Sequence, residues 1–281
     1  MAENIVLCST GAFIGTKNHF NHSLIAKIKP DLAYHGYELL MFDYFVDNPD
    51  EYRTVAKIVM DARKDGIVFY SMHMNKRIGN LISRNENDDI DNAFKIFESN
   101  CKYAVKYGVK LLVLHLWGGT SSDKNIEVNI QLFPKLKEIS DSYGLILTIE
   151  NIVCNTYKPL DHMRELWNLY PNDIKFTIDV RQAEFHKSLK ETCESSFLWE
   201  NNLVSHLHIS DYKGGYMDWL RLRINPPLNC GDVDFDYLFS FLKSIRFGGS
   251  VTLEHNFTHE SEDLLPMLNQ SYEFIANGLR K

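Results

Sequence analysis

The sequence contains little that would place this protein in a membrane or in an oxidising compartment. It has 5 cysteines, an odd and scattered set without a C-x-x-C pair, which argues against a disulfide framework and against a thiolate zinc site. No apolar run approaches the about 18 residues of a membrane helix, and the start, MAENIVLCSTGAFIG, lacks a basic segment typical of a signal peptide. We therefore expect a cytoplasmic protein that does not bind membranes.

Two further features are missing, and each excludes a class of partner or fold. The chain has no cluster of Lys and Arg, and its formal net charge is −7, which argues against a surface that neutralises nucleic-acid phosphates. The segment STGAFIG at 9–15, after the first apolar run, is a poor match to G-x-G-x-x-G. A doubly wound open sheet with a dinucleotide site is therefore only the second choice of fold.

The sequence does contain short apolar runs that recur along all 281 residues. They are rich in Val, Ile, Leu and Phe with weak alternation, as expected for parallel strands that are covered on both faces. The runs are NIVLC (4–8), YELLMF (37–42), GIVFYSMH (66–73), VKLLVLH (109–115), LILTIEN (145–151), KFTID (175–179), VSHLHISD (204–211) and SVTLEHN (250–256).

Segments of helical periodicity separate these runs. Apolar residues at 94–105 have near-helical spacing and are followed by Gly108, and those at 235–245 follow Asp234, a possible N-cap. Eight strands that alternate with helices predict an α/β fold, a single (β/α)8 TIM barrel over residues 1–281 with its active site at the C-terminal ends of the strands. The connections 74–91 and 212–234 are longer than a barrel needs, which makes each a candidate lid over a substrate.

Four of the runs end in a residue that can bind a metal: Glu150, Asp179, His208 and Glu254. Because strand ends form a ring around the mouth of a parallel barrel, these four side chains are expected to converge. Mixed nitrogen and oxygen ligands favour one divalent ion among Mn²⁺, Zn²⁺, Co²⁺ and Mg²⁺.

The same segments resemble the xylose isomerase-like barrels, a family that includes sugar and sugar-phosphate isomerases and epimerases. The resemblance rests on L-T-I-E-N, T-I-D, H-L-H-I-S-D and V-T-L-E, together with G-D-V-D-F at 231–235, and it covers nearly the whole chain. It implies that Glu150 and Glu254 move a proton next to a carbonyl carbon while the metal stabilises the enediolate. His206 lies on the same strand face as His208, and the resemblance favours His208 as the ligand.

Further residues at the predicted mouth are candidates for contact with a small carbohydrate substrate. His73 and His115 end the third and fourth runs, as histidines do in many family members. Gln182 stands where family members often carry a His, which argues against a two-metal site. The remaining candidates are Trp117, Asn151, Lys213 and Arg223, with Arg221 as an alternative to Arg223.

Other functions are compatible with the same residues. A dehydratase or lyase would use the same metal and carboxylates, and a non-catalytic sugar-binding barrel would not need both Glu150 and Glu254. The apurinic-site DNA endonucleases share the barrel, but they need the His replaced by Gln182 and a D-x-H pair after the seventh strand, for which His255 and His259 come too late. The abundance of Phe and Tyr, 17 and 14 residues, allows a homodimer.

Overall fold

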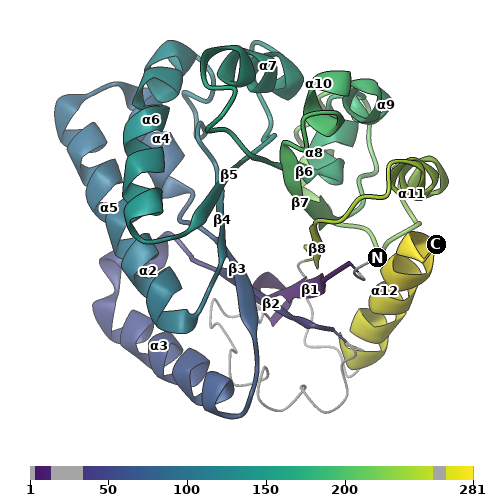
Figure 1. The fold of residues 1–281 in the computed structure, drawn as a ribbon, viewed down its shortest axis with the longest axis horizontal. Coiled ribbons are helices and arrows are strands. Elements are labelled where there is room, and N and C mark those ends of the chain that lie inside the picture. The colour runs from purple at the N-terminus through teal and green to yellow at the C-terminus, as the bar shows by residue number, and fades with distance from the viewer. Residues whose placement is uncertain (1–3, 14–33, 256–263, 281) are drawn as a thin grey trace.

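The computed structural model describes residues 4–13, 34–255 and 264–280, and it contains a closed barrel of parallel strands in the order β1 to β8. Figure 1 looks along the barrel, with the strands around the centre and the helices outside them. The strands are β1 Val6–Ser9, β2 Gly36–Leu40, β3 Phe69–His73, β4 Leu111–Leu114, β5 Ile146–Glu150, β6 Phe176–Asp179, β7 Val204–Ile209 and β8 Ser250–Leu253.

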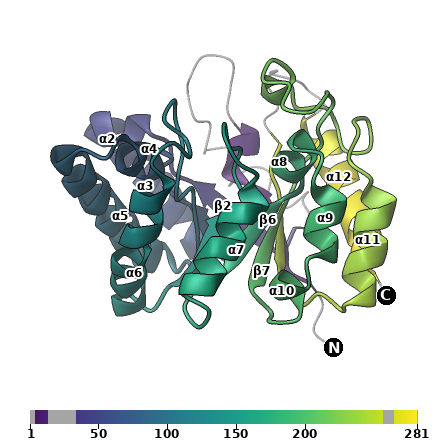
Figure 2. The same ribbon diagram turned by 90° about the horizontal axis from the view of Figure 1, so that it is seen from above.

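Helices cover the outside of the barrel in both views (Figures 1 and 2). The α-helices are α2 Tyr44–Asp47, α3 Pro49–Lys64, α4 Arg77–Arg84, α5 Asn87–Tyr107, α6 Ile126–Ser142, α7 Pro159–Leu169, α8 Val180–Phe185, α9 Leu189–Glu194, α10 Ser196–Trp199, α11 Phe235–Ser244 and α12 Leu264–Leu279. Two 3₁₀ turns, η1 Thr10–Phe13 and η3 Arg221–Arg223, complete the described elements. Among these helices, none has the length and apolar character that crossing a lipid bilayer requires.

The barrel confirms the predicted fold and its eight strands. The two predicted helices are also present. Gly108, whose φ of 73° suits a glycine, caps the C-terminus of α5, and α11 begins after Asp234, whose side chain accepts a hydrogen bond from the backbone N of Tyr237. Asn256 at the end of the last predicted run, His259, and the last two residues of STGAFIG lie outside the described residues.

Alternation along each strand separates two kinds of side chain. Leu147 and Ile149 of β5 pack in the apolar layer, whereas Thr148 and Glu150 take the opposite face. The same two-residue spacing relates Ser71 to His73, Thr177 to Asp179, His206 to His208 and Thr252 to Glu254. The barrel therefore carries two inner levels, with candidate ligands at the mouth and smaller polar side chains below most of them.

The segment 74–91 is not the open loop that its length suggested. It contains α4, whose Ile78, Leu81 and Ile82 are buried, and the first turn of α5. A Cβ added to Gly79 would meet the backbone oxygens of His115 and Trp117, so α4 packs directly against the chain that follows β4. Helix α4 is a fixed part of the wall beside the mouth.

The segment 212–234 has little regular structure, and Asp211 anchors it. The Asp211 carboxylate, which is fully buried, accepts hydrogen bonds from the backbone N of Tyr212, Cys230, Gly231 and Val233 at 2.8–3.3 Å. These bonds tie both ends of the segment to the end of β7. Its middle, with Leu220 81% exposed, extends into solvent.

Candidate metal centre

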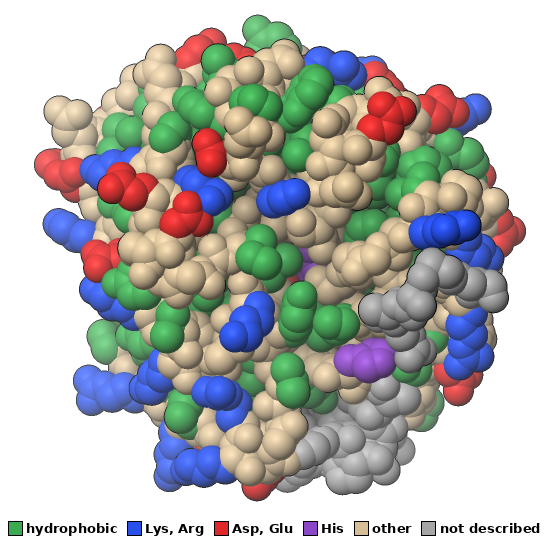
Figure 3. Space-filling model, viewed as in Figure 1, with side chains coloured by type: hydrophobic (Ala, Val, Ile, Leu, Met, Phe, Trp, Pro, Cys, Tyr) green, Lys and Arg blue, Asp and Glu red, His purple; other side chains and the backbone are tan. Residues whose placement is uncertain are grey.

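The four predicted ligands converge at the mouth of the barrel. One ligand atom from each of Glu150, Asp179, His208 and Glu254 lies within 4.8 Å of the others. The first three side chains are buried and Glu254 is half-buried, so solvent reaches the cluster beside Glu254. Figure 3 shows this view along the barrel: a histidine is visible near the centre of the face, and several Lys or Arg side chains lie around it.

His208 joins the cluster through Nδ1. This nitrogen lies 3.3 Å from Oε1 of Glu150 and 3.4 Å from Oε2 of Glu254. Asp179 approaches from β6 and uses Oδ1 to cap helix α8, accepting from the backbone N of Arg181 at 2.7 Å and of Gln182 at 3.1 Å. Its second oxygen, Oδ2, accepts no hydrogen bond from the described residues and is free to bind a cation.

The charges of the cluster favour a bound cation. Burial, with the negative charges of Glu254 and Glu150, raises the pKa of Asp179 to about 7. Burial alone would also raise the pKa of Glu254, but the charge of His208 and its hydrogen bond together outweigh burial and lower that pKa to about 2. Three carboxylates around one imidazole thus crowd negative charge in a buried space. This donor set suits a divalent ion with mixed ligands.

A second cluster lies beside the first and shares Glu150 with it. Nε2 of His115 lies 2.8 Å and Nε2 of His73 3.4 Å from Oε2 of Glu150, and the two nitrogens are 3.2 Å apart. Oε2 nevertheless has no hydrogen bond of good geometry among the described residues. One ligand atom from each of His73, His115 and Glu150 lies within 4.8 Å of the other two, which is close enough for all three to bind one ion. His73 and His115, predicted to contact substrate, are placed where they can also bind a second ion.

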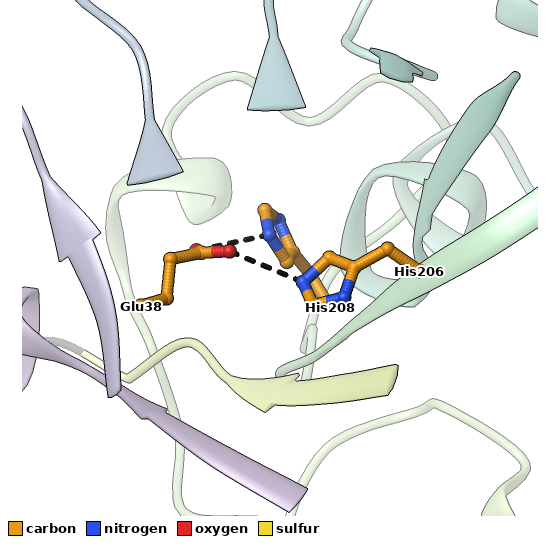
Figure 4. Close-up of side chains that lie close together, drawn as sticks. All are labelled: Glu38, His206 and His208. Carbon is orange, nitrogen blue, oxygen red and sulfur yellow. Dashed lines mark hydrogen bonds and ion pairs between the residues drawn. The ribbon is translucent and has the colours of Figure 1, made fainter. Parts of the chain in front are cut away.

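Glu38 belongs to the site although the sequence analysis did not single it out. It lies in β2, is fully buried, and its two carboxylate oxygens approach His206 and His208 from β7 (Figure 4). The run YELLMF gave no sign of this role, because a single Glu inside an apolar strand has no local signal. The observation that His206 and His208 share one face was the available clue.

Two of the predicted substrate residues already have partners within the protein. Asn151 hydrogen-bonds the backbone of Asp179 through both ends of its amide. Gln182 accepts a hydrogen bond through Oε1 from the backbone N of Val153 at 2.9 Å, so it joins α8 to the chain after β5. His186, the next histidine along the chain, accepts from the backbone N of Cys154 at 3.1 Å. Contact of Asn151 or Gln182 with a substrate stays a prediction.

The other predicted substrate residues are a buried Trp and three exposed basic residues. Trp117 is fully buried and packs edge-on against His162, with ring centroids 5.3 Å apart, which favours a packing role over an exposed sugar platform. Lys213, Arg221 and Arg223 are exposed on the segment after β7. Within the described residues, no hydrogen bond or ion pair joins their side chains to the cluster.

A third group of possible ligands, Asp123, Cys154 and His162, is better explained as structural. The Asp123 carboxylate accepts hydrogen bonds from the backbone N of Asn155, Thr156 and Tyr157 at 2.9–3.2 Å. Nε2 of His162 lies a further 3.3 Å from it. Because its oxygens are already occupied, this carboxylate anchors the chain after β5.

Comparison with known proteins agrees with this geometry. Residues 30–275 match the family model described as xylose isomerase-like TIM barrel. The chain belongs to that family. No curated protein matches its sequence.

Solved structures of this barrel superpose over nearly the whole chain. The IOLI protein with a bound zinc atom has 14% identity and a TM-score of 0.74, with 98% of this chain and 99% of that chain covered. The 3-keto-D-glucoside 4-epimerase YcjR from E. coli has 16% identity and a TM-score of 0.65, with 98% and 100% covered. A D-allulose 3-epimerase from Methylomonas sp., in complex with D-allulose, has 12% identity and a TM-score of 0.69, with 99% and 98% covered. At these identities the likeness shows the fold.

Proposed function

We propose that this member of the xylose isomerase-like family is a divalent-metal-dependent isomerase or epimerase of a small sugar or sugar phosphate. The observation that carries the proposal is the convergence of Glu150, Asp179, His208 and Glu254 within 4.8 Å at the mouth of the barrel. Proteins of similar structure, which include epimerases of keto-sugars and a protein with a bound zinc atom, agree with it.

The chemistry divides between the cation and two carboxylates. Asp179 and His208, with Glu150 and Glu254, would hold one Mn²⁺, Zn²⁺, Co²⁺ or Mg²⁺ ion, and such an ion supplies Lewis-acid stabilisation of negative charge on substrate oxygens. Glu150 comes from the end of β5 and Glu254 follows β8, so the two carboxylates approach a bound sugar from different strands. One of them removes the proton next to the carbonyl carbon, and the other returns a proton to the enediolate.

The direction of proton return separates the two reaction types. Return by the second carboxylate to the opposite face of the same carbon gives epimerisation, whereas a single carboxylate that moves the proton to the neighbouring carbon gives aldose–ketose isomerisation. The basic side chains around the centre of the face in Figure 3 suit a phosphorylated as well as a neutral sugar. Other parts of the proposal are a cytoplasmic location and a homodimer, for which the exposed Trp219 and Leu220 offer apolar surface.

The test is turnover of a panel of ketoses, aldoses and their phosphates by metal-loaded protein, followed by proton exchange from solvent D₂O. We expect one substrate class to exchange a single carbon-bound proton. Glu150→Gln and Glu254→Gln should each reduce the rate by about 10²–10⁴-fold, the usual contribution of a general base. Full activity in either variant would contradict the two-carboxylate mechanism.

The cluster of His73, His115 and Glu150 favours a second candidate function, metal-dependent phosphodiester hydrolysis. Two adjacent ions could hold the attacking and leaving oxygens of such a reaction. Metal content per chain after equilibration with Zn²⁺ or Mn²⁺ and desalting separates the candidates. One ion supports the isomerase or epimerase, and its loss in the double variant Asp179→Asn with His208→Ala would assign it to the four-ligand site. Two or three ions would favour the hydrolase.

A further inference from the structure

Glu38 is a carboxylate in an unusual position, inside the barrel and below the metal cluster. Its exposed fraction is 0%, as are those of His206 and His208. A buried carboxylate is costly unless hydrogen bonds and opposite charges compensate for its lost hydration. The three side chains come from β2 and β7 and meet in the barrel interior (Figure 4). The groups that hold the Glu38 carboxylate in place therefore indicate its role.

The two oxygens of Glu38 have different surroundings. Oε2 accepts from Oγ of Ser71 at 2.8 Å and lies 3.1 Å from Nε2 of His206, with Oγ1 of Thr252 at 3.5 Å. His206 is fixed in turn by Ser250, whose Oγ lies 2.6 Å from its Nδ1. Oε1 accepts no hydrogen bond from the described residues, and Nε2 of His208, which also has no hydrogen-bond partner among them, lies 3.1 Å from it. One oxygen is thus anchored to the barrel, and the other is presented to the candidate ligand.

The two nitrogens of His208 divide in the same way. Nδ1 faces the ligand carboxylates of Glu150 and Glu254, and Nε2 faces Glu38. A neutral imidazole has one nitrogen that carries a proton and one that carries a free lone pair. Only the lone pair can bind a metal, so cation binding at Nδ1 requires the proton to be on Nε2. Because Nδ1 is within hydrogen-bond distance of Glu150, the opposite tautomer is a direct competitor.

We propose that Glu38 is a positioning residue for the metal centre, which receives the Nε2 proton of His208 and so keeps Nδ1 free for the cation. This inference rests on the proposed function only in its requirement for a metal at the four-ligand cluster. Outer carboxylates that orient a histidine ligand in this manner commonly contribute about 10–100-fold to metal affinity. His206, which Ser250 fixes in turn, holds the other oxygen of Glu38 and does not meet the metal.

Glu38→Gln is the informative variant, because it changes one oxygen to an NH₂ group without changing the shape. Ser71 and Thr252 both donate toward the Oε2 position, so they select the amide oxygen for that side. The NH₂ group then faces Nε2 of His208. Because the amide is itself a donor, Nε2 cannot keep its own proton there and must accept a hydrogen bond instead. The variant should therefore favour the tautomer that has its proton on Nδ1, which opposes metal binding.

The experiment measures Zn²⁺ affinity by competition with a chelator, without any substrate, for wild type, Glu38→Gln and Ser71→Ala. Ser71→Ala is the matched control, since it removes the 2.8 Å bond to Glu38 but leaves the carboxylate beside His208. We expect the affinity to fall about 10–100-fold in Glu38→Gln and to change less than about threefold in Ser71→Ala. Thermal melts of the zinc-free proteins report the loss of stability in each variant.

Nitrogen-15 NMR of zinc-loaded wild type gives a readout that does not depend on whether the variant folds. The His208 signals, assigned by their loss in His208→Gln, should show zinc on Nδ1 and a proton on Nε2. Zinc on Nε2, or equal affinity losses in the two variants at equal loss of stability, would overturn the inference. So would an unchanged affinity in Glu38→Gln, which would leave the proposed function intact. Absence of zinc binding by wild type would instead overturn the metal-dependent function and this inference with it.

Discussion

Asn151 holds the backbone of Asp179 with both ends of its side-chain amide. Its Oδ1 accepts a hydrogen bond from N of Asp179 at 2.6 Å, and its Nδ2 donates to the carbonyl oxygen of Asp179 at 3.1 Å. The residue follows directly after Glu150, so this pair of bonds fixes the ends of β5 and β6 relative to each other. Two neighbouring ligands of the candidate metal centre are thereby held in register.

Asn151→Ala should therefore weaken the metal centre as well as the fold. Two buried backbone groups would lose their partners, at a cost of about 1–3 kcal/mol each in the free energy of unfolding. Zn²⁺ affinity should fall about tenfold because Asp179 is less well positioned. Chemical denaturation and chelator competition measure the two effects. Asn201→Ala, which removes one bond to the carbonyl of Phe197 far from the site, is the control. Unchanged metal affinity in Asn151→Ala would show that its role is limited to stability, or to substrate contact as the sequence analysis predicted.

Asp179→Asn separates the two tasks of Asp179. Asn is as good an N-cap as Asp, so its Oδ1 can still accept from the backbone N of Arg181 and Gln182, and the unfolding free energy should change by less than about 1 kcal/mol. The amide nitrogen in place of Oδ2 cannot bind a cation. Isothermal titration with Mn²⁺ should accordingly show a large loss of affinity, at least tenfold. A variant that binds Mn²⁺ like wild type would remove Asp179 from the ligand set.

Asp211→Asn tests the anchor of the segment 212–234. Asp211 uses Oδ1 for the backbone N of Tyr212 and Val233 and Oδ2 for that of Cys230 and Gly231. The Asn side chain accepts hydrogen bonds only through its oxygen. Two of the four backbone N–H groups would therefore face its NH₂ group, which is itself a donor. We expect a loss of about 2–4 kcal/mol in unfolding free energy and faster protease cleavage within the segment. Asp218→Asn, which affects one exposed bond to the backbone N of Arg221, should resemble wild type in both assays.

His186 should make stability depend on pH. Burial lowers its pKa to about 4 from an unfolded value near 6.5. Below pH 6.5 the unfolded chain therefore binds a proton at His186 that the folded protein does not bind. The contribution of neutral His186 to the unfolding free energy is complete above pH 6.5 and falls as the pH drops toward 4. The total loss is up to about 3 kcal/mol. Denaturation of wild type and His186→Gln between pH 7 and 4 isolates this contribution, because other groups act in both proteins. Parallel curves for the two would contradict it.

The strands and the ligands could be predicted because both leave a local signal. Each strand is a short apolar run, and at Glu150, Asp179 and Glu254 the run changes to a polar residue at the mouth. In a closed parallel barrel that position alone brings the side chains together. The structure confirms the fold, and it brings together the four residues that the sequence analysis grouped.

The parts that the sequence did not reveal depend on distant contacts. Glu38 meets Ser71 and His206, which are 33 and 168 positions away, and nothing near Glu38 indicates them. Helix α4 was not predicted from the sequence for another reason. Its segment is polar overall, and Gly79 argues against a helix, although Ile78, Leu81 and Ile82 have helical spacing. Gly79 is there because α4 lies against the backbone of the chain that follows β4.

The two inner levels of the barrel also constrain how this site can change. On β3, β5, β6, β7 and β8 a mouth residue and a polar residue below it are separated by two positions, so they belong to one strand and one face. A shift of a single residue in the pairing of any such strand would turn both inward side chains outward at once and could bring Met72, Ile149, Ile178, Leu207 or Leu253 to the mouth. A ligand and the polar residue below it therefore keep their positions only together. To move this centre into another barrel, whole strands rather than single residues would have to be transferred.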